Sequence, residues 1–381
     1  MEKLVIIERV FSSYRKPIFD QLRKHIEFKL LYGKNNSGIK TANACYSKPI
    51  YSFQYAKEET KVILFPIKEI LKIRPEVIIC DLAIGMLNLP IIIFLSKVLN
   101  IRFAFWSHGY NRKTGFNPKN KLIDKYRLFL MRLVDANIVY SQFDKAIILP
   151  YLDKDSVFVA QNTLDTEVLS GLRTKLEQEG KTIIKQRLGI KHDFNLVFIG
   201  RMLASKKPDM LLDLYEYLLL NFNISVGIHF IGEGEMLPKI KARVNKSFNI
   251  KDFYFHGAIH DDLATGQILF VNDLMINPGY LGLSVNHAFC FGCPVLSFQT
   301  KNGYPAHSPE VEYVIHNKTG FLLEEHTLEA MAIKVNDYLK NKNIQEEFGR
   351  NIKYAVENTF PIEKMVNGLM ECFEFLNAKK N

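Results

Sequence analysis

The sequence predicts an α/β protein built from two consecutive doubly wound units, and three observations support this fold class. The chain has 381 residues, of which 48% are hydrophobic and 24% charged, which is typical of two globular domains rather than one. Short apolar runs alternate with helix-length amphipathic stretches, as in parallel sheets covered on both faces. A polar, helix-prone segment over 166–191 interrupts this alternation, and we expect it to connect the two units.

The first series of elements predicts a domain over residues 1–165. The expected strands are 3–8, 28–33, 76–81, 102–108, 136–141 and 157–162, and the expected helices are 17–25, 85–100, 119–134 and 144–151. The strand segments are almost continuously apolar, which is typical of strands buried on both faces of a parallel sheet.

The second series predicts another doubly wound domain over residues 166–359. The expected strands are 194–200, 226–232, 253–258, 273–277 and 294–298, and the helices between them are 208–220, 236–244, 261–270 and 283–291. Three more helices are expected over 327–340, 344–357 and 362–377. Ligands of such sheets bind beyond the carboxyl ends of the strands, so the residues that follow each strand are the candidates for function.

The positive charge of the chain is concentrated in its first half. The net charge is +10, and residues 1–165 alone hold 26 Lys and Arg against 15 Asp and Glu. A nucleic acid, an anionic membrane surface, an anionic small ligand or simply a solubilising basic face would each explain this excess. No recognised nucleic-acid-binding module accompanies the basic residues, which disfavours a nucleic-acid partner.

The sequence shows no sign of secretion or membrane insertion. No charged and then apolar leader precedes the first expected strand, and the longest nearly apolar stretch, 82–95, contains Asn88 and Pro90. That stretch is shorter than the roughly 20 residues that span a bilayer.

Five cysteines include one close pair, Cys290 and Cys293, which is too few for a disulfide framework or a zinc ribbon. We expect reduced thiols and a cytoplasmic location.

Basic residues follow the first strand of the second domain. Gly200 ends this strand, Arg201 comes next, and Lys206 follows five positions later. An arginine fork and a mobile lysine charge together suit a pyrophosphate group. The alternative is a helix start that faces solvent and is merely basic.

Small residues end the next two strands of this domain. Gly232 and Gly234 follow one strand, and His256-Gly257 ends the next. Glycines at these positions let a ligand approach the backbone closely. We expect room for a planar nucleobase there, although a Gly-x-Gly pair is also common in turns.

The segment 277–295 carries the densest pattern. Pro278-Gly279-Tyr280-Leu281-Gly282-Leu283 connects a strand to a helix, and free backbone N–H groups at such a helix start favour an anion. His287 is about one turn inside the helix and either faces the same site or is an ordinary surface or core histidine.

The order and spacing of these motifs resemble the family of glycosyl transferases group 1, which are retaining nucleotide-sugar glycosyltransferases of the GT-B fold. The resemblance covers the whole second half, and the first half resembles the family more weakly, through residues 14–19 and 106–109. It implies two Rossmann-like domains facing a cleft, the first selecting the acceptor and the second, 166–359, binding the donor. It also implies that the C-terminal helix, 360–381, crosses back to the first domain.

The resemblance assigns roles to individual residues. The residues expected to bind the donor are Gly200, Gly232, Gly234, His256, Gly257, Gly279, Tyr280, Leu281, Gly282, Leu283, His287 and Glu312. Those expected to bind the acceptor are Tyr14, Arg15, His108 and Gly109, and the catalytic candidates are Arg201, Lys206 and His108. The family usually has two glutamates where this chain has Gly279 and His287, so contacts to the transferred sugar are expected from backbone groups or from His108.

The expected chemistry follows from the groups that are present. Arg201, Lys206 and the helix start near Leu283 would stabilise charge on a leaving diphosphate. The sequence has no carboxylate pair typical of glycoside hydrolases. No Asp-x-Asp motif falls at a plausible donor site, so we expect no essential metal and no cofactor.

We therefore expect a retaining glycosyltransferase of the hexosyltransferase type that builds a cell-surface polysaccharide such as a capsule or a lipopolysaccharide. Its expected partners are a nucleotide-sugar donor and a glycan or polyprenyl-diphosphate-linked acceptor. The alternatives are a GT-B epimerase acting on a nucleotide sugar, and a degenerate sugar-nucleotide-binding scaffold. The basic amphipathic segment 117–133 is expected to lie on an anionic membrane surface or to be a covering helix with a solvated face.

Overall fold

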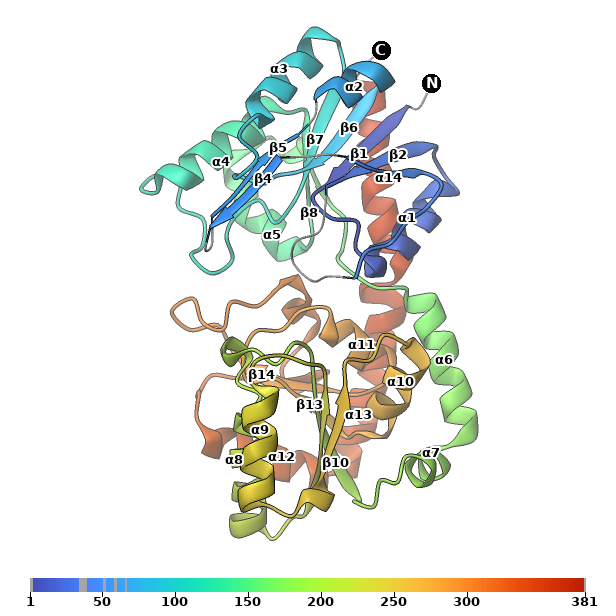
Figure 1. Ribbon diagram of the computed structural model, residues 1–381, viewed down its shortest axis with the longest axis vertical. Helices are drawn as coiled ribbons and strands as arrows, with labels where there is room; N and C mark the ends of the chain where they lie inside the picture. The colour runs from blue at the N-terminus through green and yellow to red at the C-terminus, as the bar shows by residue number, and fades with distance from the viewer. Residues whose placement is uncertain (1–2, 34–39, 51–52, 58–59, 66, 380–381) are drawn as a thin grey trace. The chain divides into compact units, whose positions relative to one another are not determined.

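The computed structural model describes residues 3–33, 40–50, 53–57, 60–65 and 67–379. The chain forms two compact units (Figure 1). Unit 1 consists of Met1–Leu164 and Ile362–Asn381, and unit 2 of Asp165–Pro361.

Unit 1 contains a parallel sheet of seven strands in the order β3-β2-β1-β6-β7-β8-β9. Its strands are β1 (Leu4–Glu8), β2 (Phe28–Tyr32), β3 (Ser47–Pro49), β6 (Val77–Asp81), β7 (Arg102–Trp106), β8 (Ala136–Val139) and β9 (Val157–Val159). A separate antiparallel pair is formed by β4 (Phe53–Lys57) and β5 (Thr60–Leu64).

Alternate residues of the unit 1 strands enter two apolar cores, one on each face of the sheet. Leu4 and Ile6 belong to the core that also contains residues of α1 (Lys16–Arg23) and α14 (Ile362–Ala378). Val5 and Ile7 belong to the other, which contains residues of α2 (Ile67–Ile73), α3 (Leu89–Val98), α4 (Leu122–Leu133) and α5 (Gln142–Ile148). This alternation, with a period of two residues, is expected of a strand that is covered on both faces.

The C-terminal helix α14 packs within unit 1 although the preceding residues belong to unit 2 (Figure 1). It contacts α1, β8 and β9. Gly368 allows the close approach, because a Cβ there would lie 2.0 Å from the carbonyl oxygen of Val159. The expected return of the last helix to the first domain is therefore confirmed.

Unit 2 contains a parallel sheet of six strands in the order β12-β11-β10-β13-β14-β15. Its strands are β10 (Phe194–Ile199), β11 (Val226–Ile231), β12 (Phe253–Gly257), β13 (Leu274–Ile276), β14 (Val295–Phe298) and β15 (Gly320–Leu323). Its helices are α6 (Thr166–Glu179), α7 (Lys181–Arg187), α8 (Met210–Phe222), α9 (Leu237–Ser247), α10 (Asp262–Val271), α11 (Ser284–Cys290), α12 (Leu328–Lys340) and α13 (Lys342–Tyr354). The strand order reverses between β10 and β13, and such a switch point is where doubly wound sheets bind ligands.

Two features differ from the sequence prediction. Residues 166–191 are part of unit 2 rather than a connection, because α6 and α7 pack against α10 and α11. Of these helices only Thr166, Leu169, Leu176 and Ile184 are buried, which is too sparse to give a long apolar run. The short elements β3, β4, β5, β15 and α2 were also missed.

In the described part of the chain, no helix has the length and hydropathy needed to cross a membrane.

Candidate functional site

The carboxyl edge of the unit 2 sheet is built from glycines that let three strand ends pack against one another. The amide of Gly200 donates to the carbonyl of Ile231, and the amide of Gly232 donates to that of Gly257 at 2.7 Å. Gly232 has φ +130°, and a Cβ on it would lie 2.0 Å from the carbonyl oxygen of Gly200. Only glycine fits there. A Cβ on Gly234 would likewise lie 2.5 Å from the carbonyl oxygen of Met202.

Lys206 brings a buried positive charge to this edge. It ends a short 3₁₀ turn, Ala204–Lys206, and is only 7% exposed. Its Nζ lies 4.5 Å from the centre of the Tyr280 ring, and 3.0 Å from the position that a Cβ of Gly200 would take. Burial, with the nearby charge of Arg201, lowers the pKa of Lys206 to about 8, while the carboxylate of Glu310 opposes this shift. An anion that binds beside Lys206 would therefore stabilise the charged form of its side chain.

Gly279 has no room for a side chain. A Cβ on Gly279 would lie 2.3 Å from Lys206 Cα and 2.4 Å from the carbonyl oxygen of Ser205. The amide of Gly279 also donates to the carbonyl of Lys206 at 3.1 Å. The turn that carries Lys206 thus occupies the space that a glutamate would need at this position.

The loop after β13 is held by buried polar residues that sequence reasoning missed. His307, 3% exposed, accepts a hydrogen bond from the amide of Leu281 at its Nδ1 and donates from Nε2 to the carbonyl of Phe298 at 2.8 Å. The Ser297 hydroxyl donates to the carbonyl of Asn277 at 2.6 Å. These contacts hold the loop that presents Tyr280, Gly282 and Leu283.

The remaining predicted residues of unit 2 surround this loop. Arg201 is exposed beside the strand end, and Leu281 is buried. His287 lies on α11, and its Nε2 is 3.5 Å from Asp262 Oδ1 on α10. Glu312 is half-buried on the turn Pro309–Tyr313.

The same turn carries Glu310, which sequence reasoning missed. It is 1% exposed and acts electrostatically on Lys206. Glu310 stands two positions before Glu312 in the segment that follows β14, and this neighbourhood is a sequence signal that could have found it.

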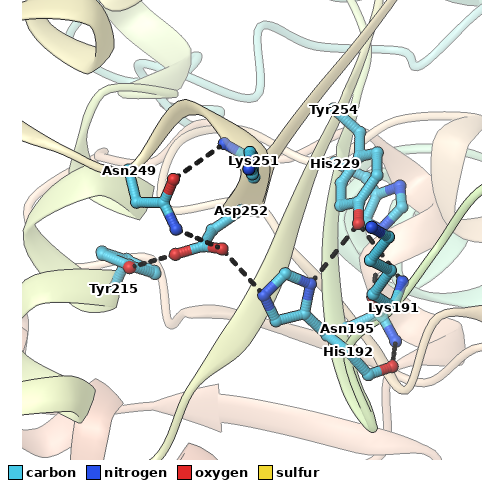
Figure 2. A network of polar contacts seen from close by, with 9 residues as sticks. All are labelled: Lys191, His192, Asn195, Tyr215, His229, Asn249, Lys251, Asp252 and Tyr254. Carbon is cyan, nitrogen blue, oxygen red and sulfur yellow. Dashed lines mark hydrogen bonds and ion pairs between the residues drawn. The ribbon is translucent and has the colours of Figure 1, made fainter.

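His256 adjoins a buried polar network that crosses the sheet. His256 Nε2 lies 3.1 Å from Nδ1 of His229 on β11, and His229 Nε2 lies 3.2 Å from Oδ1 of Asn195 on β10. Figure 2 shows His229 beside Asn195 and Tyr254, with His192 connecting them to Asp252. Such a chain of polar contacts inside a sheet fixes hydrogen positions as well as ring orientations.

Arg15 of unit 1 is buried rather than directed at solvent. Its guanidinium lies 4.5 Å from the centre of the Trp106 ring and 5.2 Å from that of Tyr140. It donates to the Tyr140 hydroxyl at 2.8 Å and to Glu8 at 3.2 Å. Its predicted neighbour Tyr14 is 38% exposed.

The carboxyl edge of the unit 1 sheet also holds acidic groups that were not predicted. Glu8 ends β1 and Asp81 ends β6, where Asp81 is paired with Arg9. Burial raises the pKa of Glu8, against the opposing charge of Arg15.

His108 lies beyond the same sheet edge, after β7. Its Nδ1 is 3.2 Å from Oδ2 of the fully buried Asp144, which also pairs with Arg112, and its ring centre is 4.8 Å from that of Tyr140. Gly109 has φ +74°, and a Cβ there would lie 2.9 Å from the side chain of Ile148. The Asp144 carboxylate therefore orients the imidazole of His108.

The arrangement can bind an anion and stabilise a negatively charged leaving group. At this edge of the unit 2 sheet the cations are Lys206 and Arg201, which is exposed after the same strand. Within the described residues there is no group of three or more His, Cys, Asp or Glu side chains placed to hold a metal ion.

Comparison with known proteins shows which family this part of the chain is similar to. Residues 180–354 match the family model of the glycosyl transferases group 1. A poly(ribitol-phosphate) alpha-N-acetylglucosaminyltransferase of Staphylococcus aureus is 22% identical over 256 residues, which are 66% of this chain. The match spans 46% of that relative, so this chain corresponds to about half of its length.

Several solved glycosyltransferase structures share the fold over nearly the whole chain. A glycosyltransferase from Rickettsia africae is 14% identical with a TM-score of 0.69, covering 99% of both chains. Anabaena HepE in complex with UDP is 13% identical with a TM-score of 0.67, covering 98% of this chain and 100% of its own. The S. aureus protein TarM is 14% identical with a TM-score of 0.63, covering 98% and 99%. Residues 180–354 of this chain therefore match the glycosyl transferases group 1 family, and the chain with its two parallel sheets has the GT-B fold.

Proposed function

We propose that this protein is a retaining glycosyltransferase that moves a hexosyl group from a nucleotide sugar to a glycan or lipid-linked acceptor in cell-surface polysaccharide synthesis. The observation that carries the proposal is Lys206, a buried cation with a lowered pKa at the carboxyl edge of unit 2. Supporting context comes from the relatives. HepE was solved with UDP-glucose, and a TarM mutant with Fondaparinux, alpha-GlcNAc-glycerol and UDP. WaaB is described as a lipopolysaccharide outer core galactosyltransferase.

In the proposed reaction, the bond between the anomeric carbon and the leaving diphosphate breaks while a bond to the acceptor oxygen forms on the same face of the sugar. The acceptor hydroxyl proton passes to the departing phosphate oxygen. Lys206 and Arg201 stabilise the charge that accumulates on that oxygen, and such preorganised groups act most strongly in the transition state. No metal takes part in this scheme, because the two side chains carry the neutralising charge.

Unit 1 is proposed to hold the acceptor. His108, oriented by Asp144, and Glu8, whose pKa burial raises, lie on separate strand ends of its sheet. Both side chains can hydrogen-bond a hydroxyl group.

The decisive test is incubation with UDP-, GDP- and dTDP-sugars, with and without polyprenyl-diphosphate-linked oligosaccharides, followed by NMR of the product's anomeric centre. We expect transfer with retention of configuration that survives EDTA. Inversion would refute the retaining mechanism, and formation of an epimer without acceptor would favour a nucleotide-sugar epimerase. Nucleotide binding without any turnover would favour a scaffold.

We further propose that unit 1 contacts an anionic membrane through α3 and α4. Both helices contribute to the same core on one face of the sheet, through Ile92 on α3 and Leu128 on α4 among others. Each helix leaves apolar side chains exposed, and these are Ile91, Phe94 and Val98 on α3 and Leu122, Ile123, Tyr126 and Phe129 on α4. Phe94 is 65% exposed and Leu122 80%.

The charges on these two helices suit anionic lipid. Lys97, Lys119 and Lys125 are exposed on or beside the two helices, whereas Asp124 is buried and paired with Arg127. Apolar stripes flanked by basic residues are typical of surfaces that lie in the interface of an anionic bilayer.

A further inference from the structure

The hydrogen-bond network behind His256 determines which of its ring nitrogens carries the proton. Asn195 is fully buried on β10, and its side-chain amide donates from Nδ2 to the carbonyl of His192 at 2.9 Å. This contact orients the amide, so that Oδ1 faces His229 at 3.2 Å. A carbonyl-type oxygen only accepts, and His229 Nε2 must therefore donate to it.

The anchor of the network lies at the opposite end of the strands. His192 Nε2 is 3.0 Å from the carboxylate of Asp252, which also accepts from the Tyr215 hydroxyl at 2.6 Å (Figure 2). Asp252 thus holds the His192 side chain, and the backbone carbonyl of the same residue orients the Asn195 amide. Gly227 on β11 leaves space for the Asn195 side chain, because a Cβ at position 227 would lie 2.5 Å from Asn195 Oδ1.

His229 transmits this orientation to His256. His229 is fully buried, with its ring stacked on Tyr254 at 4.4 Å between centres and nearly parallel to the His256 ring at 5.4 Å. Burial and the neighbouring His256 hold the pKa of His229 well below its usual range, so the ring is neutral and carries one proton. With that proton on Nε2, His229 Nδ1 is a bare acceptor, and His256 Nε2 at 3.1 Å must donate to it.

His256 is left with a lone pair on Nδ1. Burial lowers the pKa of His256 to about 4, so this ring is also neutral at physiological pH. Nδ1 has no hydrogen bond with any other described residue, and it is not among the fully buried polar atoms that lack a partner. His256 directly precedes Gly257, whose carbonyl is joined to Gly232 at the edge where the nucleotide is proposed to bind.

We propose that Asn195 and His229 act as positioning residues that fix His256 as a hydrogen-bond acceptor, which selects a donor nucleobase carrying an imino N–H. Uracil, thymine and guanine have such a group, whereas cytosine and adenine present a lone pair at the corresponding ring nitrogen. This selection rests on the proposed function, since it needs a nucleotide to bind at this edge.

The first measurement determines the tautomers and needs no ligand. Long-range ¹H–¹⁵N NMR of histidine-labelled protein, with His229 and His256 assigned through single His→Asn variants, identifies the protonated nitrogen of each ring. We expect both to carry their proton on Nε2. A proton on Nδ1 of His256 in the native protein would overturn the proposal, whatever the protein's activity.

The second measurement tests base selection with ligands that differ mainly on the base edge. Calorimetry compares UDP with CDP, and GDP with ADP. We expect the imino N–H base of at least one pair to bind about tenfold or more tightly than its partner. Binding with ratios near one in both pairs would overturn the selection while leaving the proposed function standing. dTDP is titrated alongside, and if neither it nor any of the four nucleotides binds, the proposed function fails and the selection with it.

Variants connect the two measurements. Asn195→Asp places a carboxylate against His229 Nε2 and favours protons on both of its nitrogens, which moves the His256 proton to Nδ1 and should abolish or reverse the preference. His229→Phe keeps the stacked ring and releases His256, so that the preference should shrink even if Asn195→Asp does not fold. Tyr254→Phe is the matched control, because it keeps the stack with His229 and removes only a hydroxyl that lies 3.4 Å from the His192 ring, with no contact to Asn195, His229 or His256 nitrogens. An unchanged UDP:CDP or GDP:ADP ratio in His229→Phe would refute the positioning role.

Discussion

The backbone of Lys206 lies directly against Gly279, so that the residue at 279 determines where the buried ammonium can sit. A Cβ on Gly279 would be 2.3 Å from Lys206 Cα, and the Gly279 amide donates to the Lys206 carbonyl at 3.1 Å. The absence of a side chain at position 279 is therefore what allows the Lys206 backbone to lie where it does.

Gly279→Ala should destabilise the fold, and Gly279→Glu should do so more strongly. Backbone atoms of Ser205 and Lys206 must move to admit any side chain, and such overpacking costs about 1–3 kcal/mol. Thermal unfolding of the variants measures the loss. Gly282→Ala is the control, because its Cβ would meet only Ser308 Oγ at an ordinary 3.8 Å. Equal stability of Gly279→Ala and Gly282→Ala would contradict the packing argument.

Lys206→Gln should lower turnover by roughly 100–1000-fold, the usual effect of removing one preorganised group from a transition state. Binding of the nucleotide should weaken far less, since the ammonium acts mainly when the glycosidic bond breaks. Steady-state rates and calorimetry separate the two effects. Lys207→Gln serves as the control, because Lys207 is exposed and lies above Tyr304 instead. Near-native turnover in Lys206→Gln would move the phosphate site elsewhere.

The pH dependence of kcat/KM should report the titration of Lys206 in the free enzyme. Because its pKa is lowered to about 8, kcat/KM should fall as the pH rises through that value. In Lys206→Arg this alkaline limb should disappear, since arginine stays charged. A limb that persists unchanged in Lys206→Arg would belong to another group.

The stability of the protein should respond to the same titration with the opposite sign. The lysine pKa falls from its ordinary 10.5 to about 8 on folding, so the unfolded chain binds more protons between these values. The free energy of unfolding should therefore rise with pH in this window, relative to Lys206→Met, and the gain should be lost as the pH falls through 8. Denaturant titrations at pH 7, 8 and 9 measure the difference, and a flat difference would show that the pKa is not lowered.

Binding to anionic vesicles should depend on α3 and α4. Replacing Lys97, Lys119 and Lys125 with Gln should weaken the association, because each basic residue near such a surface contributes about 1 kcal/mol. Sedimentation with phosphatidylglycerol vesicles measures it. The matched control replaces Lys239, Lys241 and Lys246, three exposed lysines of α9 in unit 2. Equal losses in both triple variants would indicate non-specific charge attraction, and no binding by the native protein would refute the membrane contact.

The sequence by itself determined the α/β class, most of the long strands and helices and the strand ends at which polar and small residues gather. These features are local, because a buried parallel strand is an apolar run and a helix on its surface repeats its apolar positions every three to four residues. Short elements such as β3 and β15 lie at sheet edges and carry too few residues for such a pattern.

Only the tertiary structure decided which distant residues meet. Lys206 over Tyr280, Gly279 against Lys206, and Asn195 behind His229 each join segments from different strands, and the strand order and register that align them leave no local signal. The same holds for Arg15, which the family resemblance predicted to bind the acceptor and whose guanidinium packs against the rings of Trp106 and Tyr140. Burial and charge pairing arise only when the sheet is packed. They determine that Lys206 is a buried cation, His256 a hydrogen-bond acceptor and Arg15 a buried structural residue.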